Sequence, residues 1–359
     1  EPQKNLSTLQ DPWTLVWFHG GLSSRDYPAD IASATQPNQD PRAREQLAAL
    51  GAVPKGLTRR RVVLVPPGLS VAALNARKAE YPGAEIVITR FQAQDRFAGF
   101  WRVLLNMEDN MSAALTWFER QAASVAAEAG LDDLKKLIDK AMAQKTMDRG
   151  SGGRLHRLLD SLAPWIANTG KEQGSLWDKF RGAQIIVDMR SDGLSQRDAL
   201  GAMLALLCSL SLRRDLKGKP WAVVAILDEL NKLISQCRIS PAVMSIITEL
   251  RHRLMMLLIG CHLPSDLPRE LRQLCNGLLS GRVEDQEAYD SLCDIKPGFK
   301  SISRKTAATL QRGEFMGCFS ECSDPALAGQ AFLLKIRPAA CQSGGQTQTT
   351  GDEGADDGA

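Results

Sequence analysis

Two adjacent carboxylates end an apolar segment of the sequence, AVVAILDELNKLI, at residues 222–234. Asp228 and Glu229 follow a run of aliphatic residues that is typical of a buried strand. Burying charge is costly unless pairing or a bound metal compensates for it. In phosphoryl-transfer sites an Asp at a strand end holds Mg²⁺, and the next Glu orients and deprotonates the attacking water. The same pattern also fits a strand that ends in a solvated acidic turn, so the pair alone does not decide between the two.

Such a site also needs a loop that binds phosphate, and the sequence contains no GxxxxGK[ST] motif. The best positional candidate is HGGLSSRD, 19–26, which follows the predicted strand 14–18 and contributes Gly20, Gly21, Ser23, Ser24 and Arg25. Its second Gly, its Lys and its final Ser or Thr are absent, and Arg does not substitute cleanly for Lys. Three interpretations stay open: a phosphate loop upstream of this chain, a degenerate loop, or a divergent loop at 19–26. The position of the preceding strand favours a divergent or degenerate loop.

The elements that must position these residues are strands that alternate with helices. The strand RVVLV at 61–65, a helix at 71–80 and the strand at 84–91 form a βαβ unit, which implies parallel pairing. Further strands are predicted at 183–189, 221–227 and 254–262, with helices at 41–50, 196–212 and 241–253. Their near-continuous apolar runs are typical of strands covered on both faces. We therefore expect an α/β fold with a mainly parallel sheet flanked by helices.

The remaining segments suggest how the chain is divided. We expect an N-terminal part of the core over 1–97, an inserted helical region over 98–181 and a C-terminal part of the core over 182–340. In the inserted region Leu131, Leu134, Ile138 and Met142 share one helical face. The Gly-rich run at 149–153 follows no strand and is predicted to be a flexible connector. Two late segments at 313–320 and 330–338 are expected to be an edge hairpin or closing strands, and the acidic, polar tail 341–359 is expected to be disordered.

Composition sets few limits on function. The chain has 359 residues, 44% apolar residues and a net charge of +3, so a proper core is expected and nucleic acid is neither indicated nor excluded. The only tight basic run is Arg59-Arg60-Arg61. The eight cysteines form no CxxC pair and several of them lie in apolar runs, which fits a reducing cytoplasm. No run reaches the ~18 to 20 apolar residues of a membrane span. Because the chain begins at Glu1, we also expect that it is a fragment of a longer protein.

The order of these segments resembles the HerA/FtsK superfamily of DNA-pumping P-loop ATPases, its HerA-like branch most of all, over roughly residues 61–337. WAVVAILDELNKL, 221–233, resembles the family's Walker B strand and following helix. The segments that resemble its other parts in order are the strand and long helix at 185–207, the basic turn, sensor strand and loop at 247–268, the segment at 278–292 and the late strand pair at 310–319. The resemblance implies a P-loop NTPase fold of the RecA/FtsK type.

The resemblance also implies roles for individual residues, together with ATP and Mg²⁺ as cofactors. Asp228 would help to hold Mg²⁺, and Glu229 would be the catalytic base. His262 ends the predicted sensor strand where the family usually has Gln, and it could still hydrogen-bond a phosphate or water. Alternatively, His262 would form a hydrogen bond with a purely structural role. The candidates for contacting a neighbouring subunit's nucleotide are Arg251, Arg253 and Arg282. For each of them the alternative is a surface ion pair.

The function that the resemblance implies is that of a cytoplasmic, hexameric ring motor that moves double-stranded DNA in conjugation, DNA processing or defence. The alternative is a catalytically inactive or weak ATPase that acts as a scaffold or ring subunit, which the missing phosphate-loop Lys motivates. The retained Asp228-Glu229 pair argues against that alternative. A motor that acts on protein in secretion or packaging would share the chemistry, and the sequence does not separate it from a DNA motor.

Overall fold

The computed structural model describes residues 13–19, 37–53, 59–97, 99–104, 113–124, 130–166, 175–191, 193–214, 218–228, 241–322 and 324–336. The segment 20–25 and Glu229, which carry several of the predicted site residues, lie outside the described residues. Within the described residues, no helix is both long and apolar enough to cross a membrane.

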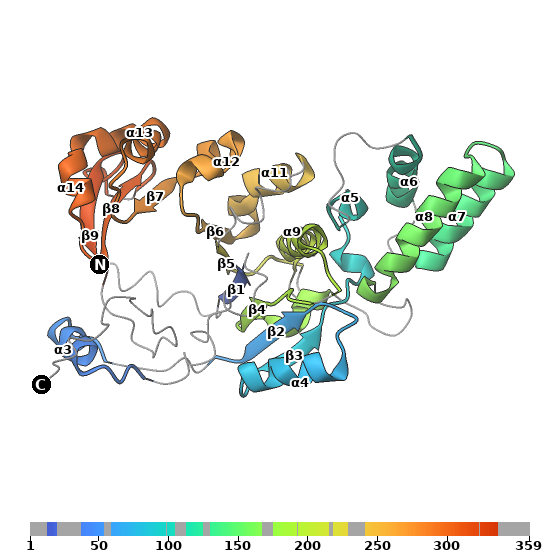
Figure 1. Cartoon of the computed structure of the whole chain (residues 1–359), viewed down its shortest axis with the longest axis horizontal. Coiled ribbons are helices and arrows are strands. Elements are labelled where there is room, and N and C mark those ends of the chain that lie inside the picture. Colours follow the sequence, from blue (N-terminus) through green and yellow to red (C-terminus); the bar gives the residue numbers. More distant parts are fainter. Residues whose placement is uncertain are drawn as a thin grey trace, which may run out of the picture.

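A six-stranded parallel sheet forms the centre of the molecule (Figure 1). Its strands run in the order β3-β2-β4-β1-β5-β6. Their bounds are Thr14–His19 for β1, Arg61–Val65 for β2, Glu85–Ile88 for β3, Gln184–Val187 for β4, Val223–Asp228 for β5 and Met255–Ile259 for β6. All of their pairings are parallel, so the predicted α/β fold with a parallel sheet is confirmed.

Helices cover the two faces of this sheet in different places. Helix α9 (Gln196–Leu212) leads from β4 to β5 and shares the main core with alternate residues of the sheet, such as Val16, Leu64 and Ala225. Helix α4 (Val71–Glu80) leads from β2 to β3 and covers the opposite face around Val63 and Ile186. Because parallel crossovers are right-handed, connections that run in opposite directions along the sheet lie on opposite faces. The sequence therefore places these two helices correctly as crossover connections.

The prediction that every strand is covered on both faces holds for only part of the sheet. Strands β2 and β4 are buried throughout. Strand β6 lies at the edge among the described strands, and Met256 and Leu258 on one of its faces are 58% and 46% exposed. The apolar run at 254–262 was thus wrongly interpreted as fully buried, because an apolar run does not show how much of its surface the neighbouring layer covers.

Helices α5 (Phe100–Leu104), α6 (Ala113–Ser124), α7 (Leu131–Ala143) and α8 (Arg149–Leu162) occupy the stretch expected to be an inserted helical region (Figure 1). The Gly-rich run that was predicted to be a connector is instead the first part of α8. Asp148 caps this helix by accepting a hydrogen bond from the backbone N–H of Ser151 at 2.8 Å. Gly152 allows close packing, since a Cβ there would overlap the side chain of Met142 on α7 and force it to move. Capping and close helix contact therefore outweigh the low helix propensity of glycine.

A buried carboxylate ties together the two ends of the inserted stretch. Asp95 ends the short helix η1 (Ala93–Asp95) and is fully buried. It accepts hydrogen bonds from the Ser175 hydroxyl at 2.5 Å, from the backbone N–H of Leu176 at 3.1 Å and from that of Gln92 at 2.7 Å. Leu176 begins η3 (Leu176–Phe180), which precedes β4. The carboxylate thus fixes the point where the chain leaves the sheet to the point where it returns.

The burial of Asp95 makes stability depend on pH. Burial raises the pKa of this carboxyl to about 6, although the hydrogen bonds from Ser175, Gln92 and Leu176 oppose the shift. Because the folded pKa lies above the unfolded value, the folded chain binds the additional proton between about pH 4 and 6, and stability falls as pH rises through this window. We expect Asp95 to account for a decrease of about 2 to 3 kcal/mol in unfolding free energy. Urea unfolding at several pH values should show that the unfolding free energy of Asp95→Asn does not have this decrease between about pH 4 and 6. The same pH dependence in wild type and variant would contradict the prediction.

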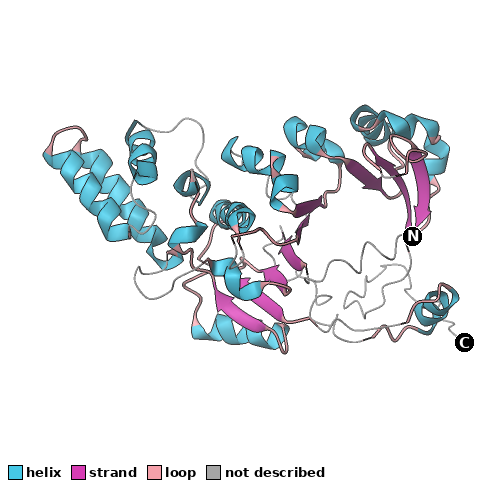
Figure 2. Cartoon of the chain, turned by 180° about the vertical axis from the view of Figure 1, so that it is seen from behind, coloured by secondary structure: helices cyan, strands magenta, loops and turns pink. Residues whose placement is uncertain are grey.

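The C-terminal strands form a second sheet and do not close the first one. Strands β7 (Gly277–Ser280), β8 (Glu314–Phe319) and β9 (Ala331–Lys335) pair antiparallel in that order. Figure 2 shows this sheet apart from the parallel strands. Its own core includes Phe299 and Met316. The remaining described α-helices are α3 (Pro41–Ala49), α11 (Pro241–Thr248), α12 (Arg269–Leu274), α13 (Gln286–Ile295) and α14 (Arg304–Ala308).

Candidate functional site

The carboxyl ends of the central strands lie in one row. His19 at the end of β1 is in register with Asp228 at the end of β5. On the other side of β1, Phe18 is in register with Val187, so that Asp188 follows β4 at the level of His19. Gly260 follows β6 and donates its backbone N–H to the Leu227 carbonyl at 2.8 Å. Segments that are more than 200 residues apart in the sequence therefore meet at this edge.

This row lies at the point where the direction of the chain along the sheet reverses. From β2 the chain proceeds to β3 with α4 on one face, whereas from β4 it proceeds over β1 to β5 with α9 on the other face. In open α/β sheets, ligands bind outside the carboxyl ends of the strands at such a switch point. The ends of β1 and β5 are thus the place on this sheet where a ligand site is expected.

Asp228 is the strand-end carboxylate that the row leaves partly exposed. The neighbouring Gly260 is close to it, since a Cβ at that position would lie 2.8 Å from Asp228 Oδ1. The glycine therefore leaves space beside this oxygen, where a larger side chain would crowd a bound cation. Carboxylate oxygen is a preferred ligand of Mg²⁺, which is usually bound through one or two carboxylates together with substrate phosphates. This arrangement fits Mg²⁺, although the described residues include no group of three or more His, Cys, Asp or Glu side chains that could hold a metal by themselves.

The other predicted site residues lie at different distances from this row. His262 is exposed two residues beyond Gly260, on the same edge. Arg251 and Arg253 belong to the turn η4 (Leu250–Arg253), which precedes β6 and therefore lies at the opposite edge, a strand length of roughly 17 Å away. Arg253 Nη2 pairs there with Glu249 Oε2 at 2.6 Å. Arg282 follows β7 and pairs with Glu284 at 3.1 Å. The turn that contains Arg251 and Arg253 therefore lies at the edge of the sheet opposite to Asp228.

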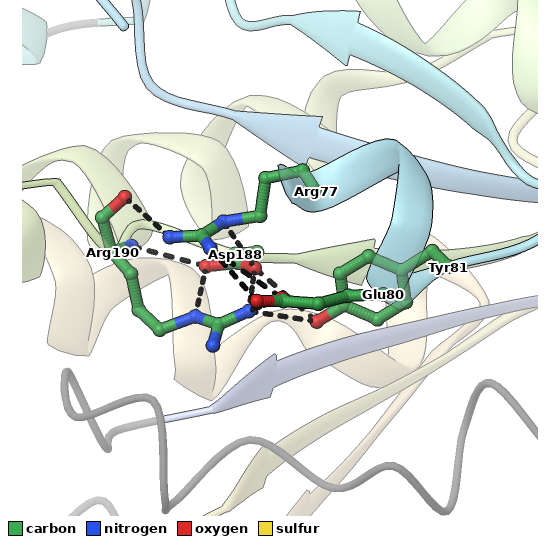
Figure 3. Close-up of polar contacts among 5 residues, drawn as sticks. All are labelled: Arg77, Glu80, Tyr81, Asp188 and Arg190. Carbon is green, nitrogen blue, oxygen red and sulfur yellow. Dashed lines mark hydrogen bonds and ion pairs between the residues drawn. The ribbon is translucent and has the colours of Figure 1, made fainter. Parts of the chain in front are cut away.

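Asp188 belongs to an ion-pair network that the sequence analysis missed (Figure 3). The carboxylate is fully buried, and its Oδ1 accepts from Arg190 Nε at 2.9 Å. Its Oδ2 accepts from Arg190 Nη2 at 2.5 Å and from the Tyr81 hydroxyl at 3.2 Å, and it lies 3.1 Å from Arg77 Nε. Glu80 Oε2 accepts from Arg190 Nη2 at 2.6 Å. The network attaches the end of α4 to the end of β4.

The positive charges of Arg77 and Arg190 balance the negative charge of the buried Asp188 carboxylate. Burial lowers the pKa of Arg190, but the hydrogen bonds and the negative charge of Asp188 raise it further, so the net pKa is above its ordinary value. Burial and the charge of Asp188 raise the pKa of Tyr81, which therefore stays a phenol that donates its proton. Asp188 is thus fully engaged within the fold, whereas Asp228 is more accessible. The segment IIVD ends at Asp188 just as AILD ends at Asp228. This repeated pattern of an apolar run followed by Asp is the sequence signal from which Asp188 could have been predicted.

No model of a known protein family matches the sequence, and no curated protein is significantly similar to it. Several solved structures are similar to the chain at low sequence identity, and three of them are described below. VirB4 of Thermoanaerobacter pseudethanolicus is 13% identical with a TM-score of 0.43, and the similarity covers 90% of this chain and 88% of that one. The plasmid coupling protein TrwB, in complex with a GTP analogue, is 13% identical with a TM-score of 0.46, over 95% and 88% of the two chains.

The third structure covers a smaller part of the chain. It is the genome packaging NTPase B204 from Sulfolobus turreted icosahedral virus 2 in complex with ATP-γS, at 14% identity and a TM-score of 0.33, over 47% of this chain and 75% of that one. These three proteins are what this chain is similar to, at sequence identities of 13 to 14%.

Proposed function

We propose that the chain is the α/β domain of a HerA/FtsK-like ATPase that works as a hexameric ring and moves double-stranded DNA. One observation carries the proposal: the predicted metal ligand Asp228 is in register with the end of β1, the strand that leads directly into the predicted phosphate loop. The ends of β1 and β5, which were singled out separately in the sequence, are thereby neighbours. They meet at the switch point of a parallel sheet, where a nucleotide site is expected.

In the proposed mechanism each residue has a positional or electrostatic task. Asp228 would hold Mg²⁺, which when bound neutralises phosphate charge. Gly20, Gly21, Ser23, Ser24 and Arg25 would contact the phosphates, and His262 would hydrogen-bond a phosphate oxygen or the attacking water. Glu229 would orient that water and accept its proton. Because the turn with Arg251 and Arg253 lies at the opposite edge of the sheet from Asp228, these residues would act at the nucleotide of a neighbouring subunit, and we propose the same role for Arg282.

A second candidate function is a scaffold or ring subunit without turnover. The observation in its favour is the sequence of the segment 19–26, which lacks the second Gly, the Lys and the final Ser or Thr of a phosphate loop. This candidate keeps the fold and the oligomer and loses hydrolysis. A motor that acts on protein instead of DNA would keep the fold, the oligomer and hydrolysis.

Steady-state hydrolysis of Mg-ATP by the purified chain, with and without linear duplex DNA, tests the proposal. We expect turnover that rises with DNA and that decreases by at least about 100-fold in Glu229→Gln, since a general base typically contributes 10²- to 10⁴-fold. Turnover in wild type that equals that of the variant would contradict the ATPase proposal and favour the scaffold. Hydrolysis that is lost in the variant but does not respond to DNA would retain the ATPase and contradict the DNA substrate.

A further inference from the structure

The basic run Arg59-Arg60-Arg61 lies at the amino end of β2, on the edge of the parallel sheet opposite to Asp228. Other basic residues lie near the amino ends of the neighbouring strands. Lys179 and Arg181 precede β4, Lys219 precedes β5, Arg253 precedes β6, and Arg213 and Arg214 follow α9. Acidic residues at this edge, within the described part of the chain, are Asp178, Glu85 and Glu249. Among the described residues of this edge, the basic residues therefore outnumber the acidic ones.

Contacts show that this edge is continuous from β2 to β6. Arg60 Nη1 donates to the Lys179 carbonyl at 2.6 Å, which joins the starts of β2 and β4. Arg59 lies over the ring of Trp13 at 4.2 Å and donates to its carbonyl, which joins β2 to the residue before β1.

The contacts continue toward β6 through the residues after α9. Arg213 Nη2 donates to the carbonyl of Trp221 before β5 and to the carbonyls of Arg253 and Leu254 before β6. With strands about 4.8 Å apart, the five amino ends span about 19 Å. We name this surface the amino edge.

Several of these guanidinium groups carry charge that the fold does not neutralise. Among the described residues, Arg59, Arg213 and Arg214 have backbone carbonyls or an aromatic ring as partners and no carboxylate. Arg213 is 1% exposed. Burial and then the charges of Arg214 and Arg253 lower its pKa to about 10, so that it remains charged at neutral pH. The amino edge thus has an excess of positive charge that a polyanion would stabilise.

We propose that the amino edge binds the phosphate backbone of nucleic acid. Duplex DNA has one phosphate per ~3.4 Å along each strand, so a surface of ~19 Å faces several phosphates at once. Arginine, the commonest cation of this edge, matches phosphate through two parallel hydrogen bonds. Contacts to phosphates carry no sequence information, so we expect binding that depends on charge and not on sequence.

The inference deepens the DNA-handling part of the proposed function and does not depend on the ATP-hydrolysing part. The carboxyl edge, with His19 and Asp228 at the ends of β1 and β5, lies at the other end of the same strands. Nucleic acid at the amino edge would therefore leave the nucleotide site open. Binding measured without nucleotide tests this surface by itself, whereas hydrolysis measured without DNA tests the site at the carboxyl edge by itself.

The experiment compares two variants of the full chain with equal net charge. The amino-edge variant replaces four exposed residues by Glu, namely Lys179, Arg181, Lys219 and Arg214. The control variant replaces four exposed residues of α7 and α8 by Glu, namely Lys136, Lys140, Arg154 and Arg157. Binding of a fluorescent duplex of arbitrary sequence, about 30 base pairs long, is measured by anisotropy over a range of KCl concentrations.

We expect micromolar binding by wild type and at least about 30-fold weaker binding by the amino-edge variant near 0.1 M salt. We also expect a salt slope that is smaller by about 3, since each lost phosphate contact removes about 0.9 from it. The control variant should stay within about threefold of wild type. Equal weakening in both variants would overturn the proposal, as would full competition by polyglutamate or preferential binding to vesicles of phosphatidylglycerol, which would assign the edge to an acidic protein or a membrane.

Folding is checked by thermal melting of both variants. If the amino-edge variant melts early, the milder pair Arg214→Gln and Lys219→Gln replaces it. This pair should still weaken binding by several-fold and reduce the salt slope by more than 1. An unchanged slope in the milder pair would contradict the proposal.

Discussion

Replacing Asp188 by Asn is expected to lower the unfolding free energy by about 3 to 5 kcal/mol, the usual cost of removing one partner from a buried ion pair. The reason is that Arg190 and Arg77 would stay buried with their positive charges, and only the partly exposed Glu80 would be left to balance them. Urea unfolding followed by tryptophan fluorescence measures the change. A loss below about 0.5 kcal/mol would show that the network can be rearranged at little cost.

Glu80→Gln is the matched control for this prediction, because it removes one carboxylate from the same network. Glu80 is 40% exposed, and solvent screens its interaction with Arg190. We expect this variant to lose about 1 kcal/mol or less. If Asp188→Asn and Glu80→Gln lost the same unfolding free energy, the burial of Asp188 would not explain its contribution to stability.

Replacing Asp228 by Asn is expected to lower Mg-ATP hydrolysis by at least about 100-fold and to raise the Mg²⁺ concentration that half-saturates the remaining activity. The carboxamide is neutral and is a weaker ligand for Mg²⁺ than a carboxylate. Because Asp228 is only partly buried, we expect the unfolding free energy to change by less than about 1 kcal/mol. Hydrolysis measured across a Mg²⁺ titration, together with urea unfolding, separates the loss of a metal ligand from the loss of the fold.

Asp266→Asn is the matched control for Asp228→Asn. Asp266 ends the short helix η5 (Pro264–Asp266), which follows β6, and its side chain is exposed. The same change of charge there should leave both the activity and the Mg²⁺ dependence within about twofold of wild type. If Asp228→Asn hydrolysed Mg-ATP as fast as Asp266→Asn, Asp228 would not be a ligand in the proposed metal site.

The main elements of the parallel sheet could be predicted because their signals are local. Aliphatic, β-branched runs and the βαβ spacing indicate the strands, and the long apolar helix before β5 was predicted over its full extent, 196–212. The errors arose where packing outweighed a local signal. The Gly-rich start of α8 is helical because Asp148 caps it and Gly152 fits against Met142. The last two strands pair with each other, as in the expected hairpin, but they also pair with β7 in a separate sheet, which no local pattern predicts.

The sequence by itself determined the parallel α/β class and the position of Asp228 at the end of a strand, since both depend on residues close together in the chain. The tertiary structure decided which strand ends are neighbours. It placed His19 beside Asp228, gave Asp188 its partners from α4 and gathered the basic residues at the amino edge. The physical reason is that parallel pairing and the neutralisation of buried charge join segments more than 100 residues apart, which no local pattern in the sequence encodes.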